Sequence, residues 1–382
     1  MLPFENLSSD PEQQYFSDGI TSDITDCLMR FRSFAVIGRY SASAFRGTLP
    51  DFTAIRNKLD ADFVVTGTMR RAGERIRIAL RLSSVESGEA IWAERYDRPM
   101  SDIFALQDEI SELVAAAIAS HLLVEINARS TAKLHTNLTS YERMLQGYWQ
   151  FRKYTVASIL AARQCFEQAV AIDPGNAEAL AWLGCTYASS WTYDFSVENA
   201  TKAAELSAEA ISIDPLRAVN HAIHNYALLC NGDLDAALRT SERGLALNPG
   251  QPAILVNRAL TLAYDGRTSE ARDLMRQALT LEPLPPLWYA EFNSVIAFAE
   301  GQYEEALAGV EPLTEMAWDI MYALSSYGHL GRTDQARATL ARLEHEGRTP
   351  NWYYGVSREP YRDARLRAQL IKGLELSVAE NG

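Results

Sequence analysis

The chain has 382 residues, a length that suggests two or three domains, and its hydrophobic fraction of 47% and charged fraction of 22% are typical of a soluble globular protein. A net charge of −13 argues against binding to nucleic acid or to an anionic membrane surface. No apolar run approaches the roughly 18 residues needed to span a bilayer and no signal peptide opens the chain, so we expect a cytoplasmic protein.

The first 125 residues combine helical stretches with the period-two alternation of β-strands. Between Arg75 and Leu82, apolar residues alternate with arginines, as in a half-buried strand. Gly73 and Gly88 mark hairpin turns on either side. We predict an α+β domain over residues 1–128, a mixed sheet with helices on one face. In chain order its elements are a first strand at the start of the chain, a helix over 20–31, a strand over 34–37, a helix over 53–59, strands over 62–69, 75–82 and 89–96, and a helix over 101–117.

Four stretches of this region carry longer motifs, at residues 2–20, 64–71, 89–97 and 102–109. They include Leu2-Pro-Phe-Glu-Asn-Leu, Val64-Val-Thr-Gly-Thr-Met and Glu89-Ala-Ile-Trp-Ala-Glu-Arg-Tyr. Together they resemble a TolB-amino-terminal-like domain. The resemblance implies tetratricopeptide repeats downstream and an effector upstream, either a class III adenylate/guanylate cyclase domain or a winged-helix DNA-binding domain. The family's first strand begins before Leu2, so we expect either a short first strand or a stand-alone or truncated regulatory half.

An internal period near 34 residues dominates the rest of the chain. Prolines 174, 215, 249 and 283 end similar segments and lie 41, 34 and 34 residues apart. In a second series, Gly232, Gly266, Gly301 and Gly331 are each followed five residues later by alanine. Glycine suits the left-handed end of a first helix, alanine a close helix contact, and proline the end of a second helix. This pattern predicts repeated helix-turn-helix units.

The period and these positions resemble the tetratricopeptide family, which implies an all-α superhelix over residues 129–350. We predict four clear units and one or two divergent ones after Pro283, and a capping helical tail over 351–382. A seven-residue inserted loop around Trp191–Phe195 accounts for the longer spacing. Its aromatic residues pack internally or, as the minority interpretation, contact a partner.

Motifs for catalysis are missing from the sequence, and we predict no enzyme activity, no cofactor and no metal site. His221 and His224 are three residues apart but lack a third ligand at set spacing, and the four cysteines show no pairing pattern. The arginines of the sheet form either an anion-binding face or, as we favour, a charge-paired one. The acidic residues expected to pair with them are Glu74, Glu86, Glu89 and Glu94.

The first helix of each repeat lines the concave surface of such a superhelix, and its exposed side chains form the binding groove. We expect a protein or peptide partner there, held as an apolar segment or amphipathic helix, with a homodimer as a further possibility. Packing against the next helix is the alternative role for some of these residues. The groove candidates are Glu178, Cys185, Ser189, Val219, Tyr226, Cys230, Val256, Leu260 and Tyr264.

Two functions therefore remain open. The leading hypothesis is a non-catalytic protein-interaction and regulatory module of a bacterial signalling system, in which the repeats bind a partner. The alternative is a small-molecule sensor in the N-terminal domain that regulates an effector missing from this chain. The alternative predicts a formed polar pocket in that domain.

Overall fold

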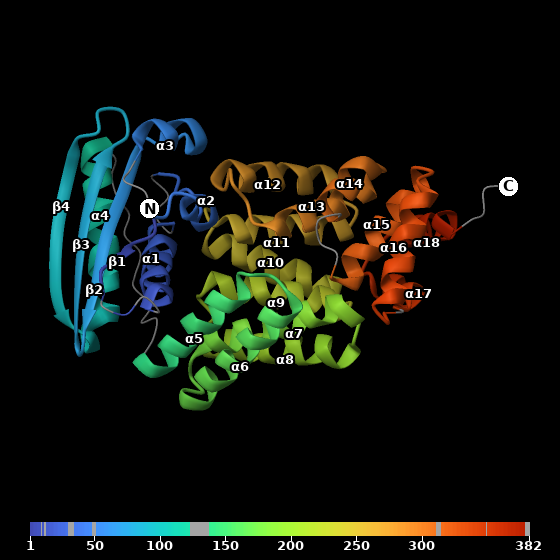
Figure 1. The fold of residues 1–382 in the computed structure, drawn as a ribbon, viewed down its shortest axis with the longest axis horizontal. Helices are drawn as coiled ribbons and strands as arrows, with labels where there is room; N and C mark the ends of the chain where they lie inside the picture. The colour runs from blue at the N-terminus through green and yellow to red at the C-terminus, as the bar shows by residue number, and fades with distance from the viewer. Residues whose placement is uncertain are drawn as a thin grey trace. The chain divides into compact units, whose positions relative to one another are not determined.

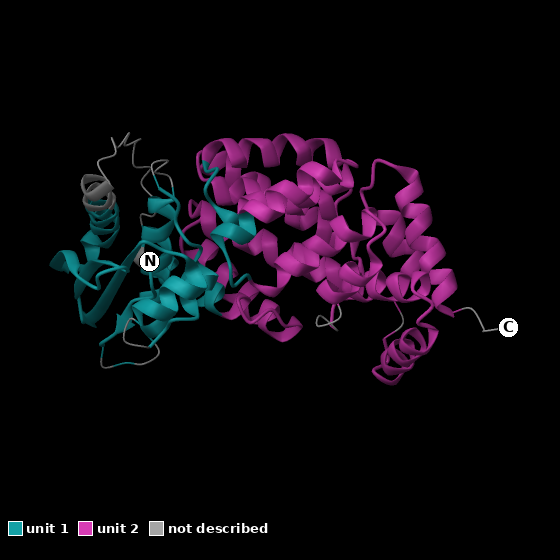
Figure 2. Cartoon of the chain, turned by 90° about the horizontal axis from the view of Figure 1, so that it is seen from above, with its two compact units in different colours: residues 1–149, 248–252, 278–285 teal, residues 150–247, 253–277, 286–382 magenta. Residues whose placement is uncertain are grey.

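The computed structural model describes residues 1–8, 10, 13–29, 34–47, 51–122, 137–310, 315–348 and 350–378. The chain divides into two compact units, coloured separately in Figure 2. Unit 1 contains residues 1–149, 248–252 and 278–285, and unit 2 contains 150–247, 253–277 and 286–382. The domain boundary predicted at 128/129 lies outside the described residues.

A four-stranded mixed sheet forms the centre of unit 1 (Figure 1). Its order is β1-β2-β3-β4, in which β1 pairs in parallel with β2 and the other neighbours are antiparallel. Gly73 and Gly88, both with positive φ, lie at the two hairpin turns. The mixed sheet is therefore confirmed, with a first strand of only two residues. The strands are β1 (Glu5–Asn6), β2 (Phe63–Ala72), β3 (Arg75–Ser84) and β4 (Ala90–Pro99).

Helices α1 (Gln14–Leu28) and α4 (Ile103–Leu122) contact each other and the edge strands β1 and β4. Met69 of β2 lies opposite Ile78 of β3, and both side chains are fully buried. Alternate residues of β3 are buried, as expected for a strand with one face on the core. The predicted layer of helices on the sheet is confirmed.

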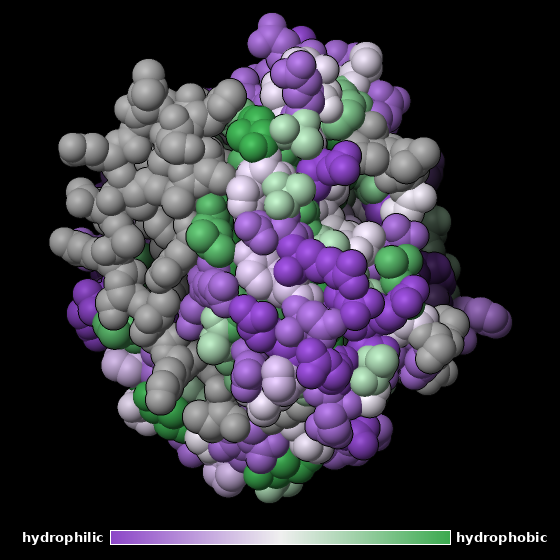
Figure 3. Space-filling model, turned by 90° about the vertical axis from the view of Figure 1, so that its left-hand side faces the viewer, coloured by the Kyte–Doolittle hydropathy of each residue, from purple (hydrophilic) through white to green (hydrophobic). Residues whose placement is uncertain are grey.

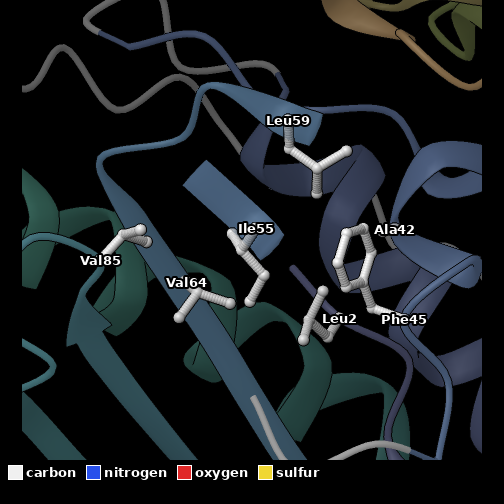
Figure 4. Packing of buried hydrophobic residues seen from close by; sticks show 7 residues of the cluster. All are labelled: Leu2, Ala42, Phe45, Ile55, Leu59, Val64 and Val85. Atoms are coloured by element: carbon white, nitrogen blue, oxygen red, sulfur yellow. The ribbon is translucent and has the colours of Figure 1, made fainter. Parts of the chain in front are cut away.

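The Phe63 end of β2 is covered on both faces. Val64 and Val65 are both buried although successive strand residues point to opposite faces. Val64 packs in a cluster with Ile55 of α3 (Phe52–Leu59) and Ala42 of α2 (Arg39–Ser43), shown in Figure 4. Burial of this cluster attaches α3 to the sheet.

The strand predicted over 34–37 is wrong. Residues 35–38 have no regular secondary structure, and the next backbone donor, Gly38 N, bonds to Leu281 O at 2.7 Å. Segment 278–285 therefore satisfies this backbone in place of the sheet. In the same segment, Glu282 is buried and accepts a hydrogen bond from Ser41 N at 2.6 Å.

Helix α5 (Leu138–Phe151), predicted as the first helix of the first repeat, contributes residues 138–149 to unit 1. Its Tyr141 is fully buried, donates to Asp23 of α1 and accepts from Gln107 Nε2 of α4 at 3.1 Å. The Leu145 side chain lies so close to Gly19 that no room is left for a Cβ there. Hydrogen bonding and close packing thus join α5 to α1 and α4.

Unit 2 consists of helices arranged as consecutive pairs, which confirms the predicted all-α repeat region (Figure 1). The pairs continue without interruption after Pro283, where divergent repeats were expected. Helix α6 (Val156–Ile172) precedes them. The pairs are α7 (Ala177–Asp194) with α8 (Val197–Ile213), α9 (Ala218–Cys230) with α10 (Leu234–Leu247), α11 (Pro252–Tyr264) with α12 (Thr268–Leu281), α13 (Leu287–Ala299) with α14 (Tyr303–Val310), and α15 (Ala317–His329) with α16 (Thr333–His345).

The glycine and alanine series occupy the positions that the repeat pattern predicts. Gly232 follows α9 with φ of +83°, and Asp233 N bonds back to Leu228 O at 2.9 Å, which ends the helix. The equivalent glycines after α11, α13 and α15 also have positive φ. The alanines that follow are all fully buried, namely Ala237, Ala271, Ala306 and Ala336.

The insertion around Trp191–Phe195 is helical, so the predicted inter-helix loop is wrong. It extends α7 to 18 residues, and Phe195 ends the helix in a left-handed conformation with φ of +57°. The Trp191 and Phe195 rings are buried and meet edge to face at 5.6 Å between centroids. Their burial supports internal packing for these two rings.

Two further helices, α17 (Trp352–Arg358) and α18 (Ala364–Val378), form the C-terminal tail. Helix α18 contacts α15 and α16, as expected for a capping helix. The approach is close, since a Cβ on Gly328 would overlap Gly373 O. A side chain at either glycine would therefore push the cap away.

We predict that Ala271→Arg unfolds unit 2, because it forces a charged side chain into a fully buried helix contact. The expected loss is roughly 4 kcal/mol or more of unfolding free energy, measured by urea denaturation. Gln277→Arg is the matched control, since that residue is exposed on the same helix. Equal stability of the two variants would contradict the repeat register.

Candidate functional site

The first helices of the repeats meet one another on the inside of unit 2. Helix α7 contacts both α9 and α15, and α13 contacts α15. The Tyr226 ring of α9 lies 5.3 Å from the Phe292 ring of α13. The inner surface is therefore lined by side chains from several repeats, and much of it is closed by these contacts.

The nine predicted groove residues lie on these first helices, but most are less accessible than expected. Ser189, Cys230, Val256, Leu260 and Tyr264 are buried, so the expectation that they are exposed is wrong at these five positions. The first helices pack against each other, and at Tyr264 the Tyr361 ring adds cover at 4.9 Å between centroids. Glu178, Cys185, Val219 and Tyr226 are half-buried. Binding of a partner by these residues stays a prediction.

Glu178 is already engaged in an ion pair. Its carboxylate accepts a hydrogen bond from Arg217 Nη2, which precedes α9, and both side chains are largely buried. Trp182 Nε1, one turn further along α7, donates to the same carboxylate at 3.4 Å. This pairing joins the starts of two successive first helices, so Glu178 offers no free charge to a ligand.

A short extended segment between α17 and α18 lies against this inner surface. Glu359 is only 1% exposed, and its carboxylate accepts three hydrogen bonds. The donors are Tyr264 Oη at 2.8 Å, Trp318 Nε1 at 2.7 Å and Tyr322 Oη at 2.6 Å. Two first helices, α11 and α15, therefore bind a carboxylate that lies far from both of them in the sequence.

Arg362, three residues later, is bound by a second set of groups. Its backbone N donates to Tyr264 O at 2.9 Å, and its guanidinium donates to Asp235 Oδ1 at 2.6 Å and to Asp265. A cleft of about 590 Å³ runs beside the segment. Its lining includes Asn231, Asp233, Asp235, Ser357, Glu359 and Arg362.

The surroundings of the acidic residues in this site shift their pKa values. Burial raises the pKa of Glu359, whereas the three donors and the nearby Arg367 act in the opposite direction. Hydrogen bonding to Arg362 lowers the pKa of Asp235. Glu359 and Arg362 were not among the predicted site residues, because they lie outside the repeats and Glu359-Pro-Tyr-Arg362 matches no periodic signal.

A second buried polar cluster involves Glu291 of α13 and Asp319 of α15, both fully buried. Tyr154 Oη donates to Glu291 Oε2 at 2.7 Å, while among the described residues both Asp319 oxygens lack a hydrogen-bond partner. Burial raises the pKa of Glu291 to about 7. Burial and the neighbouring Glu291 raise the pKa of Asp319 well above its usual value.

The arginines of the sheet are largely paired, in agreement with the favoured interpretation, but with different partners. Arg75 Nη2 and Arg77 Nη2 donate to Asp97 at 2.5 and 2.6 Å, and Arg71 pairs with Glu142. Asp97 lies opposite Arg77 in the β3–β4 register, which explains why it replaces the predicted glutamates. On the side where β4 lies, hydrophilic residues predominate among the coloured atoms of Figure 3.

Unit 1 carries a cleft of about 760 Å³ on its sheet. Side chains of both charges and two threonines contribute to its lining, so it is polar, as the sensor hypothesis predicts. Residues that line it include Glu5, Thr66, Thr68, Arg81, Glu94 and Arg95.

The two histidines of α9 have ordinary structural partners. His221 Nε2 lies 2.9 Å from Pro215 O, and His224 Nδ1 lies 2.9 Å from Ser207 Oγ. Within the described part of the chain, no group of three His, Cys, Asp or Glu side chains is placed to hold a metal ion. No helix among those residues is long and apolar enough to cross a bilayer.

No family model matches the chain. A protein named "Putative adenylate cyclase 3" from Rhizobium meliloti (strain 1021) is 34% identical over 241 residues, which are 62% of this chain and 41% of that protein. "Cellulose synthase operon protein C" from Pseudomonas fluorescens is 34% identical over 125 residues, 32% of this chain and 9% of that protein. The chain thus spans less than half the length of either relative.

Solved structures of tetratricopeptide-repeat proteins resemble part of the chain. One from Thermus thermophilus covers 50% of this chain and 98% of its own, with 21% identity and a TM-score of 0.38. One from Parabacteroides merdae covers 64% of this chain and 100% of its own, with 16% identity and a TM-score of 0.34. The assignment of the repeats rests on the helix pairs and the glycine–alanine geometry described above.

We predict that Glu291→Gln stabilises the protein at pH 8 but hardly at pH 5. The pKa of Glu291 is about 7 in the folded chain and 4.5 ordinarily, so the folded state binds the extra proton in this window. Stability from this group is fully present below pH 4.5 and is lost as the pH rises to 7, by about 3 kcal/mol. Relief of the repulsion on Asp319 acts in the same direction.

Urea denaturation of the variant and the parent at both pH values measures this difference. Glu209→Gln is the control, since Glu209 is exposed on α8. A stabilisation of Glu291→Gln that does not change between pH 5 and pH 8 would show that Glu291 is already ionised in the folded chain.

Proposed function

We propose that this protein is a non-catalytic protein-interaction and regulatory module of a bacterial signalling system, whose repeats bind a protein partner along their inner surface. One observation carries the proposal: the repeats already hold an extended chain segment through side-chain hydrogen bonds. First helices donate to Glu359, and Asp235 of α10 and Asp265 in the turn after α11 accept from Arg362. Helical-repeat proteins commonly use such surfaces to bind extended or helical peptides.

The regulatory part of the proposal draws on the relative named as an adenylate cyclase. The 241 matched residues make up 41% of that protein, and the sequence carries no catalytic motif, so we infer that the match lies outside the catalytic domain. We assign the sheet of unit 1 to the TolB-amino-terminal-like family from the motifs at residues 2–20 and 89–97. The order of sheet domain and repeats is the one that the resemblance implies. A cytoplasmic location belongs to the same proposal, and a homodimer is a further possibility.

A small-molecule sensor in unit 1 is the second candidate function. The cleft of about 760 Å³ on the sheet favours it, because Arg81, Thr66 and Thr68 supply polar groups to its lining. A ligand there would act on an effector joined to or bound by the chain. This candidate predicts a ligand-induced rise in melting temperature that is lost in an Arg81→Ala variant.

The first function is tested with the full chain and two matched variants. Affinity capture from native cell extract, with mass spectrometry, identifies a partner, and calorimetry with the purified partner then measures its affinity. We expect Val219→Glu, on the inner helix α9, to weaken binding at least about tenfold. Leu216→Glu should leave binding unchanged, since that side chain is 59% exposed outside the first helices.

Equal affinity of both variants for the partner would place the binding surface elsewhere and contradict the proposal. The absence of any retained protein, combined with a small molecule that stabilises the chain through Arg81, would favour the sensor. Cyclase or hydrolase turnover by the purified chain would contradict the non-catalytic assignment.

A further inference from the structure

We propose that the inner surface of the repeats recognises a carboxylate and, three residues later in the same segment, an arginine. Residues Glu359–Arg362 occupy this site in the structure, and the protein partner presents the same two groups and displaces them. This inference rests on the proposed function and specifies the chemistry of its partner.

The carboxylate subsite belongs to the repeats and not to the segment that fills it. Tyr264 comes from α11, and Trp318 and Tyr322 come from α15. An indole N–H can only donate a hydrogen bond, and here it points at Glu359 Oε1 together with two phenol donors on Oε2. Three convergent donors select an acceptor with two oxygens, which a carboxylate supplies.

A positive charge lies near this subsite. Burial raises the pKa of Glu359, and Arg367, which donates to Tyr361 O at 2.8 Å, acts against that shift. Tyr322 Oη also lies 2.8 Å from Tyr361 Oη, so the hydroxyl network continues along the segment. The subsite is thus matched to a negative group beside an aromatic residue.

The second subsite selects a cation. Asp235 and Asp265 both bind the Arg362 guanidinium. Without a shared cation, the two acids would repel each other. A planar guanidinium can bind both carboxylates through separate N–H groups, which an ammonium does less well. An arginine is therefore the favoured residue at this position.

The spacing between the subsites fits an extended chain. Glu359 has φ of −63° and ψ of 124°, and Pro360 follows without a backbone N–H that would need a partner. Arg362 N donates to Tyr264 O, so one residue of α11 contacts both ends of the four-residue segment. The repeats therefore contact the side chains of Glu359 and Arg362 and the backbone of Arg362.

The occupying segment has features of a displaceable ligand. The Arg362 side chain is 50% exposed, and the cleft of about 590 Å³ lies directly beside it. The preceding helix α17 has only seven residues, and its Tyr353 and Tyr354 are exposed. A partner can engage the aspartates first and the buried carboxylate subsite afterwards.

A labelled peptide with the sequence of residues 355–365 tests the inference on the full chain. The double variant Glu359→Gln/Arg362→Gln weakens the chain's own segment and leaves the subsite residues in place. By fluorescence anisotropy, we expect this variant to bind the peptide at least about tenfold more tightly than the unsubstituted chain. A peptide that carries both Gln substitutions should bind neither protein.

Hydrogen exchange provides a second measurement that needs no variant. The Arg362 amide is hydrogen-bonded to Tyr264 O, and we expect saturating peptide to speed its exchange in the unsubstituted chain. The inference is overturned if exchange of the Arg362 amide is unchanged and the double variant does not bind the peptide. This holds even if the native partner still binds and the Val219→Glu variant weakens that binding. Equal binding of both peptides would overturn it as well.

Light scattering tests whether a second copy of the chain, and not a different protein, supplies the segment that fills the site. A dimer of the unsubstituted chain that dissociates in the double variant would mean that a second copy supplies the segment, which overturns the assignment to a different protein. The same oligomeric state in both proteins, together with peptide binding, supports it. If the chain binds no native partner while the double variant binds the peptide, only the proposed function is contradicted.

Discussion

Close contact between paired helices at a fully buried alanine is the constraint on which the repeat region depends. Ala237, Ala271 and the equivalent alanines are fully buried, so a larger side chain would have to displace its neighbours, and a glycine with positive φ follows the preceding helix. First helices of different repeats also contact each other, as Tyr226 of α9 and Phe292 of α13 do. In this interior Glu359 is stabilised by donors from neighbouring helices, whereas the buried Asp319 has no hydrogen-bond donor among the described residues and its pKa is raised.

The fold was largely predictable because its signals are local and repeated. Proline and glycine spacing predicted the helix pairs, and alternation predicted three of the four strands of the sheet. The strand expected over 34–37 failed because a short apolar run does not reveal which backbone groups it will meet, and here segment 278–285 supplies one of them. The loop predicted before Phe195 was wrong for a related reason, because an extended helix and an added loop lengthen a repeat by the same number of residues.

The candidate site was much less predictable. The position in the repeat correctly placed Tyr264 on a first helix. It does not reveal how closely the first helices approach each other, and that approach helps to decide which of their side chains are buried. Glu359 and Arg362 lie in a non-repeating tail, about 95 residues or more from Tyr264 in the sequence. Long-range pairing of this kind depends on three-dimensional contacts that a single sequence does not encode in any local pattern.

The chain enters unit 1 three times, at residues 1–149, 248–252 and 278–285. As a result, no single break in the backbone divides the protein into its two units. A fragment that ends at residue 149 would lack Glu282 and so leave the Ser41 amide without its acceptor. Limited proteolysis would then yield nicked but still associated pieces, and dissection of this protein into separately expressed halves would remove native parts from one of them.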